Sequence, residues 1–90
     1  MARTVKETNA FRRDVRRTER RNKDMAKLFA IVERLATDQA LDTRNRPHPL
    51  TGDWRPCWEC HIEPDWLLVY IVHQDYVELI RTGTHSDLFG

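Results

Sequence analysis

The sequence predicts an α+β domain in which two helices pack on a sheet, in the order β-α-α-β-β-β. Two observations predict this architecture. Apolar side chains recur at helical spacing over residues 25–36, and an unbroken apolar run, Trp66–Val72, follows between two groups of turn residues. Helices and strands in separate blocks of a chain are typical of the α+β class. A chain of 90 residues suffices for one small domain with a modest core, spanning residues 1–90.

The first two elements are a short strand and an arginine-rich helix. β-branched residues over Arg3–Thr8 indicate a strand at an edge of the sheet. Thr8 or Asn9 can cap a helix over Ala10–Arg21. That helix has a thin apolar stripe among many arginines, so we expect most of its surface to face solvent or a partner.

The second helix has the clearest pattern. It is expected to begin at Asn22 or Asp24 and to end between residues 37 and 39, because its apolar side chains repeat every three or four positions on one face. That face consists of Met25, Leu28, Phe29, Val32, Leu35 and Ala36. Residues 42–53 are predicted to be a loop, in which Pro47 and Pro49 bias the backbone of His48 towards an extended conformation.

Three strands are expected to complete the sheet. The first, Trp54–Ile62, is predicted to bulge at Pro56, because proline interrupts the hydrogen-bond ladder. The second, Trp66–Val72, is apolar on both faces and therefore predicted to be a central strand covered on both sides. The last is Tyr76–Thr82, and Ser86–Gly90 is interpreted as a short tail without regular structure.

The segment Cys57-Trp58-Glu59-Cys60-His61 matches the C-x-x-C-H pattern of c-type haem attachment. On the predicted strand, residues three apart point to opposite faces, so the two thiols do not converge. The same geometry argues against a redox dithiol and against a zinc site, which usually has four ligands in paired spacings. We interpret both residues as ordinary strand cysteines.

Charge is distributed unevenly along the chain. Residues 1–49 carry 13 Lys and Arg against 7 Asp and Glu, whereas residues 50–90 carry 2 against 7. Twelve of the fifteen cations are arginines, which suit bidentate contacts with phosphate. Two interpretations stay open: a solvated helix face, or a surface that binds a polyanion such as nucleic acid.

No targeting or membrane segment is visible in the sequence. The N-terminus lacks the apolar region of a secretory signal. The longest apolar run, Trp66–Val72, is far shorter than the roughly 20 residues of a membrane span. We therefore expect a soluble, cytoplasmic protein with no membrane partner.

Three histidines stand in specific local settings near turns and strand ends: His48, His61 and His85. Histidine both gives and takes protons near neutral pH, so this set, with Asp65 close in sequence to His61, predicts a site that handles protons. The fourth, His73, is interpreted as a turn residue. Glu59 shares strand parity with His61, which leaves it either bordering the site or serving as an ordinary strand residue.

Three motifs resemble the YafQ-like toxins of bacterial toxin–antitoxin pairs, within the RelE superfamily of ribosome-dependent mRNA endonucleases. They are His48-Pro-Leu-Thr-Gly-Asp-Trp54, His61-Ile-Glu-Pro-Asp-Trp-Leu-Leu-Val-Tyr70 and Arg81-Thr-Gly-Thr-His-Ser-Asp-Leu-Phe-Gly90. The resemblance implies a twisted, mainly antiparallel sheet with two helices on one face. It also implies a metal-independent RNase without a cofactor. Such an enzyme would cut mRNA in the ribosomal A site and be neutralised by a cognate antitoxin.

The resemblance also implies roles for individual residues. By motif position the catalytic set is His48, His61, Asp65 and His85. Within it we expect His48 as the base, His85 as the acid, His61 near the phosphate, and Asp65 orienting an imidazole.

Three further residues are implied to contact or support the substrate. Trp66 stands beside Asp65, where it binds substrate or braces the sheet. Arg81 is expected to steady the phosphate. Phe89 is expected to stack on a nucleotide, which is worth about 1–3 kcal/mol per base, or to serve as a hydrophobic latch for the tail.

Two other functions remain as alternatives. One is a non-catalytic module that binds RNA or the ribosome through the arginine helix and the aromatic residues. The other is a small metal-dependent nuclease that uses the histidines and Asp65. In the leading interpretation the partners are the antitoxin, mRNA and the ribosome.

Overall fold

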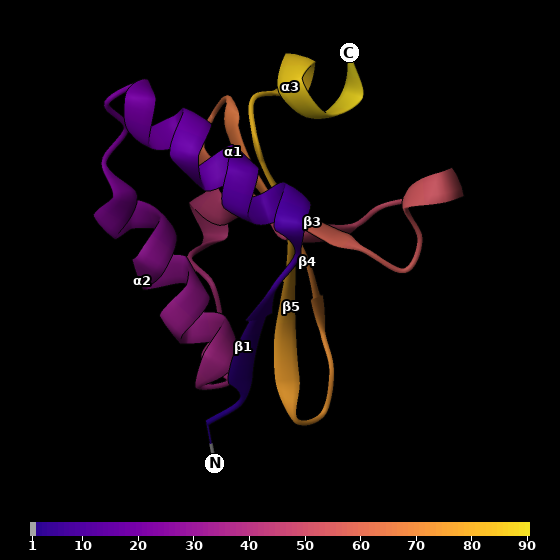
Figure 1. The fold of residues 1–90 in the computed structure, drawn as a ribbon. Coiled ribbons are helices and arrows are strands. Elements are labelled where there is room, and N and C mark those ends of the chain that lie inside the picture. Colours follow the sequence, from indigo (N-terminus) through magenta and orange to yellow (C-terminus); the bar gives the residue numbers. More distant parts are fainter. Residues whose placement is uncertain (1) are drawn as a thin grey trace.

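The computed structural model describes residues 2–90, which form a five-stranded sheet and three helices (Figure 1). The elements are β1 (Thr4–Glu7), α1 (Asn9–Arg20), α2 (Met25–Ala36), β2 (His48–Pro49), β3 (Trp58–Glu63), β4 (Trp66–Val72), β5 (Tyr76–Gly83) and α3 (His85–Phe89). Two 3₁₀ turns, Thr43–Asn45 and Gly52–Trp54, flank β2. The predicted α+β class, with two N-terminal helices and a sheet, is confirmed.

The strands follow the spatial order β1-β5-β4-β3-β2. β1 is parallel to β5, and the other three pairings are antiparallel, so the first strand lies beside the last. α1 and α2 both pack on one face of this sheet, and α3 follows β5 at the end of the chain (Figure 1). None of the helices described in residues 2–90 is long and apolar enough to cross a membrane.

Side chains fix the starts of both long helices, as the sequence predicted. The hydroxyl of Thr8 accepts a hydrogen bond from the backbone N–H of Phe11 (3.0 Å) and donates one to the carbonyl of Ile80 (2.8 Å). It thus caps α1 and ties it to β5. Asp24 caps α2 by accepting from the N–H of Ala26.

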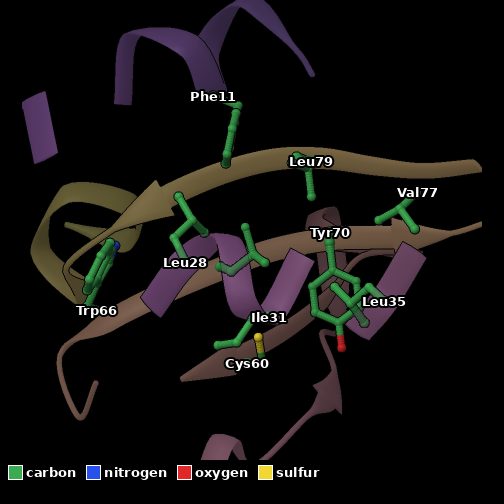
Figure 2. Close-up of a cluster of buried hydrophobic side chains, with 10 residues drawn as sticks. Phe11, Leu28, Ile31, Leu35, Cys60, Trp66, Tyr70, Val77 and Leu79 are labelled. Atoms are coloured by element: carbon green, nitrogen blue, oxygen red, sulfur yellow. The ribbon is translucent and has the colours of Figure 1, made fainter. Parts of the chain in front are cut away.

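The main core lies between the sheet and the two long helices (Figure 2). Phe11 of α1 and Leu28, Ile31 and Leu35 of α2 pack on alternate side chains of the strands, including Cys60. A second apolar cluster on the opposite face contains Cys57, Leu67, Val69 and Leu88. β4 is therefore buried on both sides, as predicted, and Leu67, Leu68 and Val69 have no exposed surface.

The two cysteines belong to these opposite clusters, which confirms that they do not converge. Both are free thiols. Burial raises the pKa of the Cys60 thiol to about 12, because the thiolate would be desolvated in the main core. Cys60 is a strand residue, as predicted, whereas Cys57 lies just before β3. The haem-like pattern is thus a coincidence of two buried cysteines in different clusters.

Three expected boundaries were wrong. The strand predicted over 54–62 begins only at Trp58: residues 52–54 form a 3₁₀ turn, and Pro56 has no N–H for a ladder. The loop expected over 42–53 contains the short strand β2. The tail expected over 86–90 is helical, because Thr84 and Asp87 form a capping box at its start.

Candidate active site

The fold brings His48, His61 and His85 together from three separate elements. His48 lies in β2, His61 in β3, and His85 is the first residue of α3. The ring centroids are 6.2 Å apart for His48 and His61, and 5.9 Å apart for His61 and His85. His61 is therefore a close neighbour of both other rings.

Strand register explains this convergence. His48 lies opposite Glu59 in the β2–β3 ladder, and His61 lies opposite Leu67 in the β3–β4 ladder. Glu59 and His61 are two residues apart, so their side chains share one face. Leu67 belongs to the second apolar cluster, so that face is the one that α1 and α2 leave uncovered.

Backbone carbonyls determine which ring nitrogen of His48 and of His61 carries a proton. Nδ1 of His48 lies 2.8 Å from the carbonyl oxygen of Arg46, and Nδ1 of His61 lies 3.2 Å from that of Pro64. A carbonyl oxygen only accepts, so Nδ1 is the donor in each ring. The neutral imidazoles then keep a lone pair on Nε2, where a proton can be taken up.

A buried carboxylate faces both of these Nε2 atoms. Oε1 of Glu59 is 3.5 Å from Nε2 of His48 and 3.8 Å from Nε2 of His61, and its side chain is only 7% exposed. Either imidazole finds a negatively charged partner when it becomes protonated. The sequence left open whether Glu59 borders the site. The only indication was that Glu59 and His61 lie on the same face of the predicted strand.

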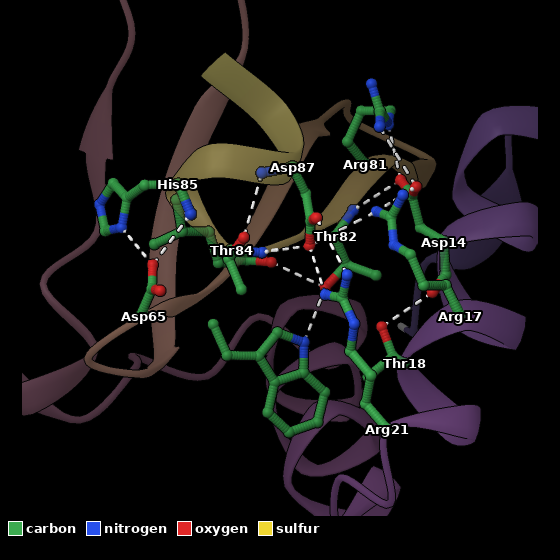
Figure 3. A network of polar contacts seen from close by, with 12 residues as sticks. Asp14, Arg17, Thr18, Arg21, Asp65, Arg81, Thr82, Thr84, His85 and Asp87 are labelled. Carbon is green, nitrogen blue, oxygen red and sulfur yellow. Dashed lines mark hydrogen bonds and ion pairs between the residues drawn. The ribbon is translucent and has the colours of Figure 1, made fainter. Parts of the chain in front are cut away.

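Asp65 holds His85 through two hydrogen bonds to one oxygen (Figure 3). Its Oδ1 accepts from the backbone N–H of His85 (2.9 Å) and lies 2.6 Å from Nδ1 of the ring. The backbone hydrogen bond, followed by that from the ring, lowers the pKa of Asp65 below its ordinary value. Asp65 is thus ionised at neutral pH, and Nε2 of His85 is left free in a ring that is half exposed.

Trp66 does not lie at the surface of this site. It is 2% exposed and belongs to the main core, where its Nε1–H donates to the hydroxyl of Thr82 (3.0 Å). The expected substrate contact is therefore wrong, because no face of the ring is open to a nucleotide. The hydrogen bond to Thr82 joins β4 to β5, which is compatible with the other expected role, bracing the sheet.

Arg81 is bound by Asp14 of α1 (Figure 3). Its Nε and Nη2 donate to the Asp14 carboxylate over 2.6 and 3.2 Å. Asp14 is 3% exposed and also accepts from Arg17 and from the backbone N–H of Thr82. Arg81 thus helps to join α1 to the edge of β5, and a contact with phosphate stays a prediction.

Phe89 is 43% exposed at the end of α3. Its ring contacts Trp54 edge-on, with the centroids 5.1 Å apart and an interplanar angle of 71°. One part of the ring is therefore packed while the rest is open. Both predicted roles, nucleotide stacking and a latch, are compatible with this position.

Within residues 2–90, no group of three or more His, Cys, Asp or Glu side chains is arranged to hold a metal ion. The fourth histidine, His73, lies away from the others at the β4–β5 turn. Its ring stacks on Tyr76, with centroids 4.1 Å apart, and its Nε2 lies 3.1 Å from Glu78.

The chain is similar to known toxins over nearly its whole length. A family described as "Bacterial toxin of type II toxin-antitoxin system, YafQ" matches residues 3–90. The mRNA interferase toxin YafQ of Escherichia coli K12 is 35% identical over 89 residues, which cover 98% of this chain and 97% of that protein.

Solved structures agree with the sequence comparison. A chain of the E. coli DinJ–YafQ toxin–antitoxin complex is 34% identical, with a TM-score of 0.91 and full coverage of both chains. A metal-bound toxin from Helicobacter pylori is 35% identical, with a TM-score of 0.90 and coverage of 99% of this chain and 100% of that one. The resemblance seen in the three motifs is thereby confirmed, and the chain belongs to the YafQ family of toxins from bacterial type II toxin–antitoxin systems.

Proposed function

We propose that this protein is a metal-independent endoribonuclease toxin that cuts mRNA in the ribosomal A site and is neutralised by a cognate antitoxin. The observation that carries the proposal is the cluster of three imidazoles, in which the ring of His61 lies 6.2 Å from that of His48 and 5.9 Å from that of His85. Relatives named mRNA interferase toxin YafQ, and a related chain in a toxin–antitoxin complex, support the substrate and the partner. Action on ribosome-bound mRNA implies a cytoplasmic location.

The reaction needs one group that removes a proton and one that supplies a proton. The ribose 2′-hydroxyl attacks the adjacent phosphorus, the bond to the 5′-oxygen breaks, and the products are a 2′,3′-cyclic phosphate and a 5′-hydroxyl end. The base takes the 2′-hydroxyl proton, and the acid protonates the departing 5′-oxygen. Positioned groups of this kind contribute typically 10²–10⁴-fold each.

His48 is suited to act as the base and His85 as the acid. The lone pair on Nε2 of His48 accepts the 2′-hydroxyl proton, and the resulting imidazolium faces Glu59. His85 is held by Asp65 at Nδ1 and delivers a proton from Nε2. His61 neighbours both rings, and when protonated it can donate to a phosphate oxygen and stabilise the developing charge.

The test is inducible expression in bacteria with mapping of mRNA 5′ ends, combined with purified ribosomes programmed with mRNA. The wild-type protein is expected to arrest growth and to create 5′-hydroxyl ends at the A site. The triple substitution of His48, His61 and His85 by alanine is expected to abolish cleavage while ribosome binding persists. His73→Ala is the matched control, because this histidine lies at the β4–β5 turn.

Unchanged growth arrest by the triple variant would favour the alternative, a module that binds the ribosome without cutting RNA. The metal-bound relative makes a chelator test necessary. Undiminished cleavage in excess EDTA is the expected result. Cleavage that stops in EDTA and returns with added metal would replace this proposal with a metal-dependent nuclease.

A further inference from the structure

Helix α3 carries two residues of the proposed site, His85 and Phe89, yet it has few apolar contacts of its own. It is five residues long, and Leu88 is its one residue in the buried clusters of the described chain. A helix this short is not stable by itself. Besides the contacts of Leu88 and of Phe89 with Trp54, polar contacts join it to the rest of the molecule.

Asp87 is the centre of those contacts (Figure 3). Its Oδ2 accepts from the backbone N–H of Thr84 (2.9 Å), and its own N–H donates to the Thr84 hydroxyl (3.0 Å). These two bonds form the capping box that starts the helix. The same carboxylate also forms an ion pair with a residue far away in the sequence.

That second contact is with Arg21, the residue directly after α1. Nη1 and Nη2 of Arg21 donate to Oδ2 and Oδ1 of Asp87 over 2.6 and 3.2 Å, a bidentate pair between residues 66 positions apart. Arg17 lies further away, with Nη2 3.7 Å from Oδ2. The Asp87 side chain is only 14% exposed, and the Arg21 bond is the main reason that its pKa lies well below the ordinary value.

Gly83 lies beside the carboxylate of Asp87 and the guanidinium of Arg17. A Cβ atom at Gly83 would lie 2.9 Å from Oδ2 of Asp87 and 3.1 Å from Nη2 of Arg17. Glycine therefore leaves the space that the Asp87 carboxylate and the Arg17 guanidinium fill. On the other side of the helix start, Asp65 holds the N–H and ring of His85.

We propose that Arg21 is a positioning residue that, through Asp87, fixes α3 so that the imidazole of His85 stays close to that of His61. This inference rests on the proposed function for its catalytic consequence, although the structural part stands alone. Arg21 does not touch the reacting atoms in this scheme. It acts through Asp87, which is two residues after His85.

The test is a double-mutant cycle of Arg21→Ala, Asp87→Asn and the combination, with cleavage measured on programmed ribosomes. Each single variant is expected to lower the saturated rate by about tenfold, because small misplacements of a catalytic group reduce rate strongly. The double variant is expected to be no worse than either single one, since both break the same contact. Arg21→Lys, which retains one charged contact, should recover part of the rate.

The two single substitutions change net charge in opposite directions, and this separates positioning from direct RNA binding. If Arg21 bound ribosomal RNA, Arg21→Ala would raise the half-saturating ribosome concentration while Asp87→Asn would lower it. That result would overturn the proposal. Arg12→Ala is the matched control, because Arg12 is an exposed α1 arginine paired only at 3.5 Å with Glu7; its saturated rate should be unchanged.

A second readout needs no cleavage. The NMR signals of the His85 ring are expected to shift in Arg21→Ala and Asp87→Asn and to stay in place in Arg12→Ala. If the wild-type protein cuts no RNA but these signals move, the proposed function fails and the positioning role stands. Unchanged His85 signals in both variants would overturn the positioning role, whatever the activity.

Discussion

Glu59 and His48 face each other across strands β2 and β3, with Oε1 of the carboxylate 3.5 Å from Nε2 of the imidazole. The carboxylate is almost fully buried, so its charge is poorly screened by solvent. Nδ1 of His48 is occupied by a backbone carbonyl, so the nitrogen that faces Glu59 is the one free to take a proton. A buried negative charge is thus aimed at the nitrogen proposed as the base.

Glu59→Gln is expected to lower the rate of mRNA cleavage by about 10²-fold, the lower end of what a positioned acid–base group contributes. The substitution keeps the shape of the side chain and removes the charge that stabilises the protonated imidazole. Rates at saturating ribosome concentration would measure the effect. Glu78→Gln is the matched control, because it disrupts a similar carboxylate–histidine pair, Glu78 with His73, at the β4–β5 turn. Equal rates for Glu59→Gln and the wild type would show that this carboxylate has no part in the reaction.

Asp87→Asn is expected to reduce stability at neutral pH but not in strong acid. The pKa of Asp87 is lower in the folded protein than its value of about 3.9 in an unfolded chain. The ionised carboxylate therefore stabilises the fold above that unfolded value, and the contribution is lost as pH falls through the folded pKa. At pH 7 the free energy of unfolding should drop by about 1.5–3 kcal/mol, as for a lost hydrogen bond to a charged group.

Urea denaturation of both proteins from pH 7 to pH 2 would measure this difference. The gap between wild type and Asp87→Asn should narrow as the pH falls below 4. Asp53→Asn is a suitable control, because within residues 2–90 this exposed carboxylate has no ion pair. A gap that is constant over the whole pH range would mean that the Asp87 charge does not stabilise the fold.

The long elements could be predicted because their signals are local. α2 has an apolar face at helical spacing and an aspartate cap, and β4 is an apolar run between turns. α3 could not be predicted in this way. Its Thr84–Asp87 capping box precedes only five residues, and what holds the helix in place comes from Arg21 and Asp65, far away in sequence.

The site could be predicted as a set of residues but not as a geometry. The motifs identified the histidines, whereas the role of Glu59 depends on the register between β2 and β3. β2 is two residues long and ends in a proline, so it is too short to show the alternation of apolar and polar side chains by which a strand is predicted. Trp66 was wrongly predicted to contact the substrate because it follows Asp65 in the motif. Side chains alternate along a strand, so that of Trp66 points to the face of the sheet that the helices cover.

Neither cysteine is expected to react with iodoacetamide in the folded protein at pH 8. Burial raises the pKa of both thiols, that of Cys60 to about 12, so almost no thiolate is present. Intact mass spectrometry should show no adduct in native conditions and two adducts in urea. Rapid labelling of one thiol in the native protein would contradict the buried positions and reopen a redox role for the C-x-x-C segment.

Phe89 offers a way to separate nucleotide stacking from a purely structural latch. The ring is packed against Trp54 on one edge and 43% exposed overall. Phe89→Leu keeps an apolar side chain against Trp54 but removes the flat aromatic face, whereas Phe89→Ala removes both.

Stacking on a base is worth about 1–3 kcal/mol, so under the stacking hypothesis both variants should need a much higher ribosome concentration for half-maximal cleavage. Under the latch hypothesis Phe89→Leu should behave as the wild type and Phe89→Ala alone should fail. We expect the first pattern, because a latch does not require 43% of the residue to stay open at the end of the helix that carries His85.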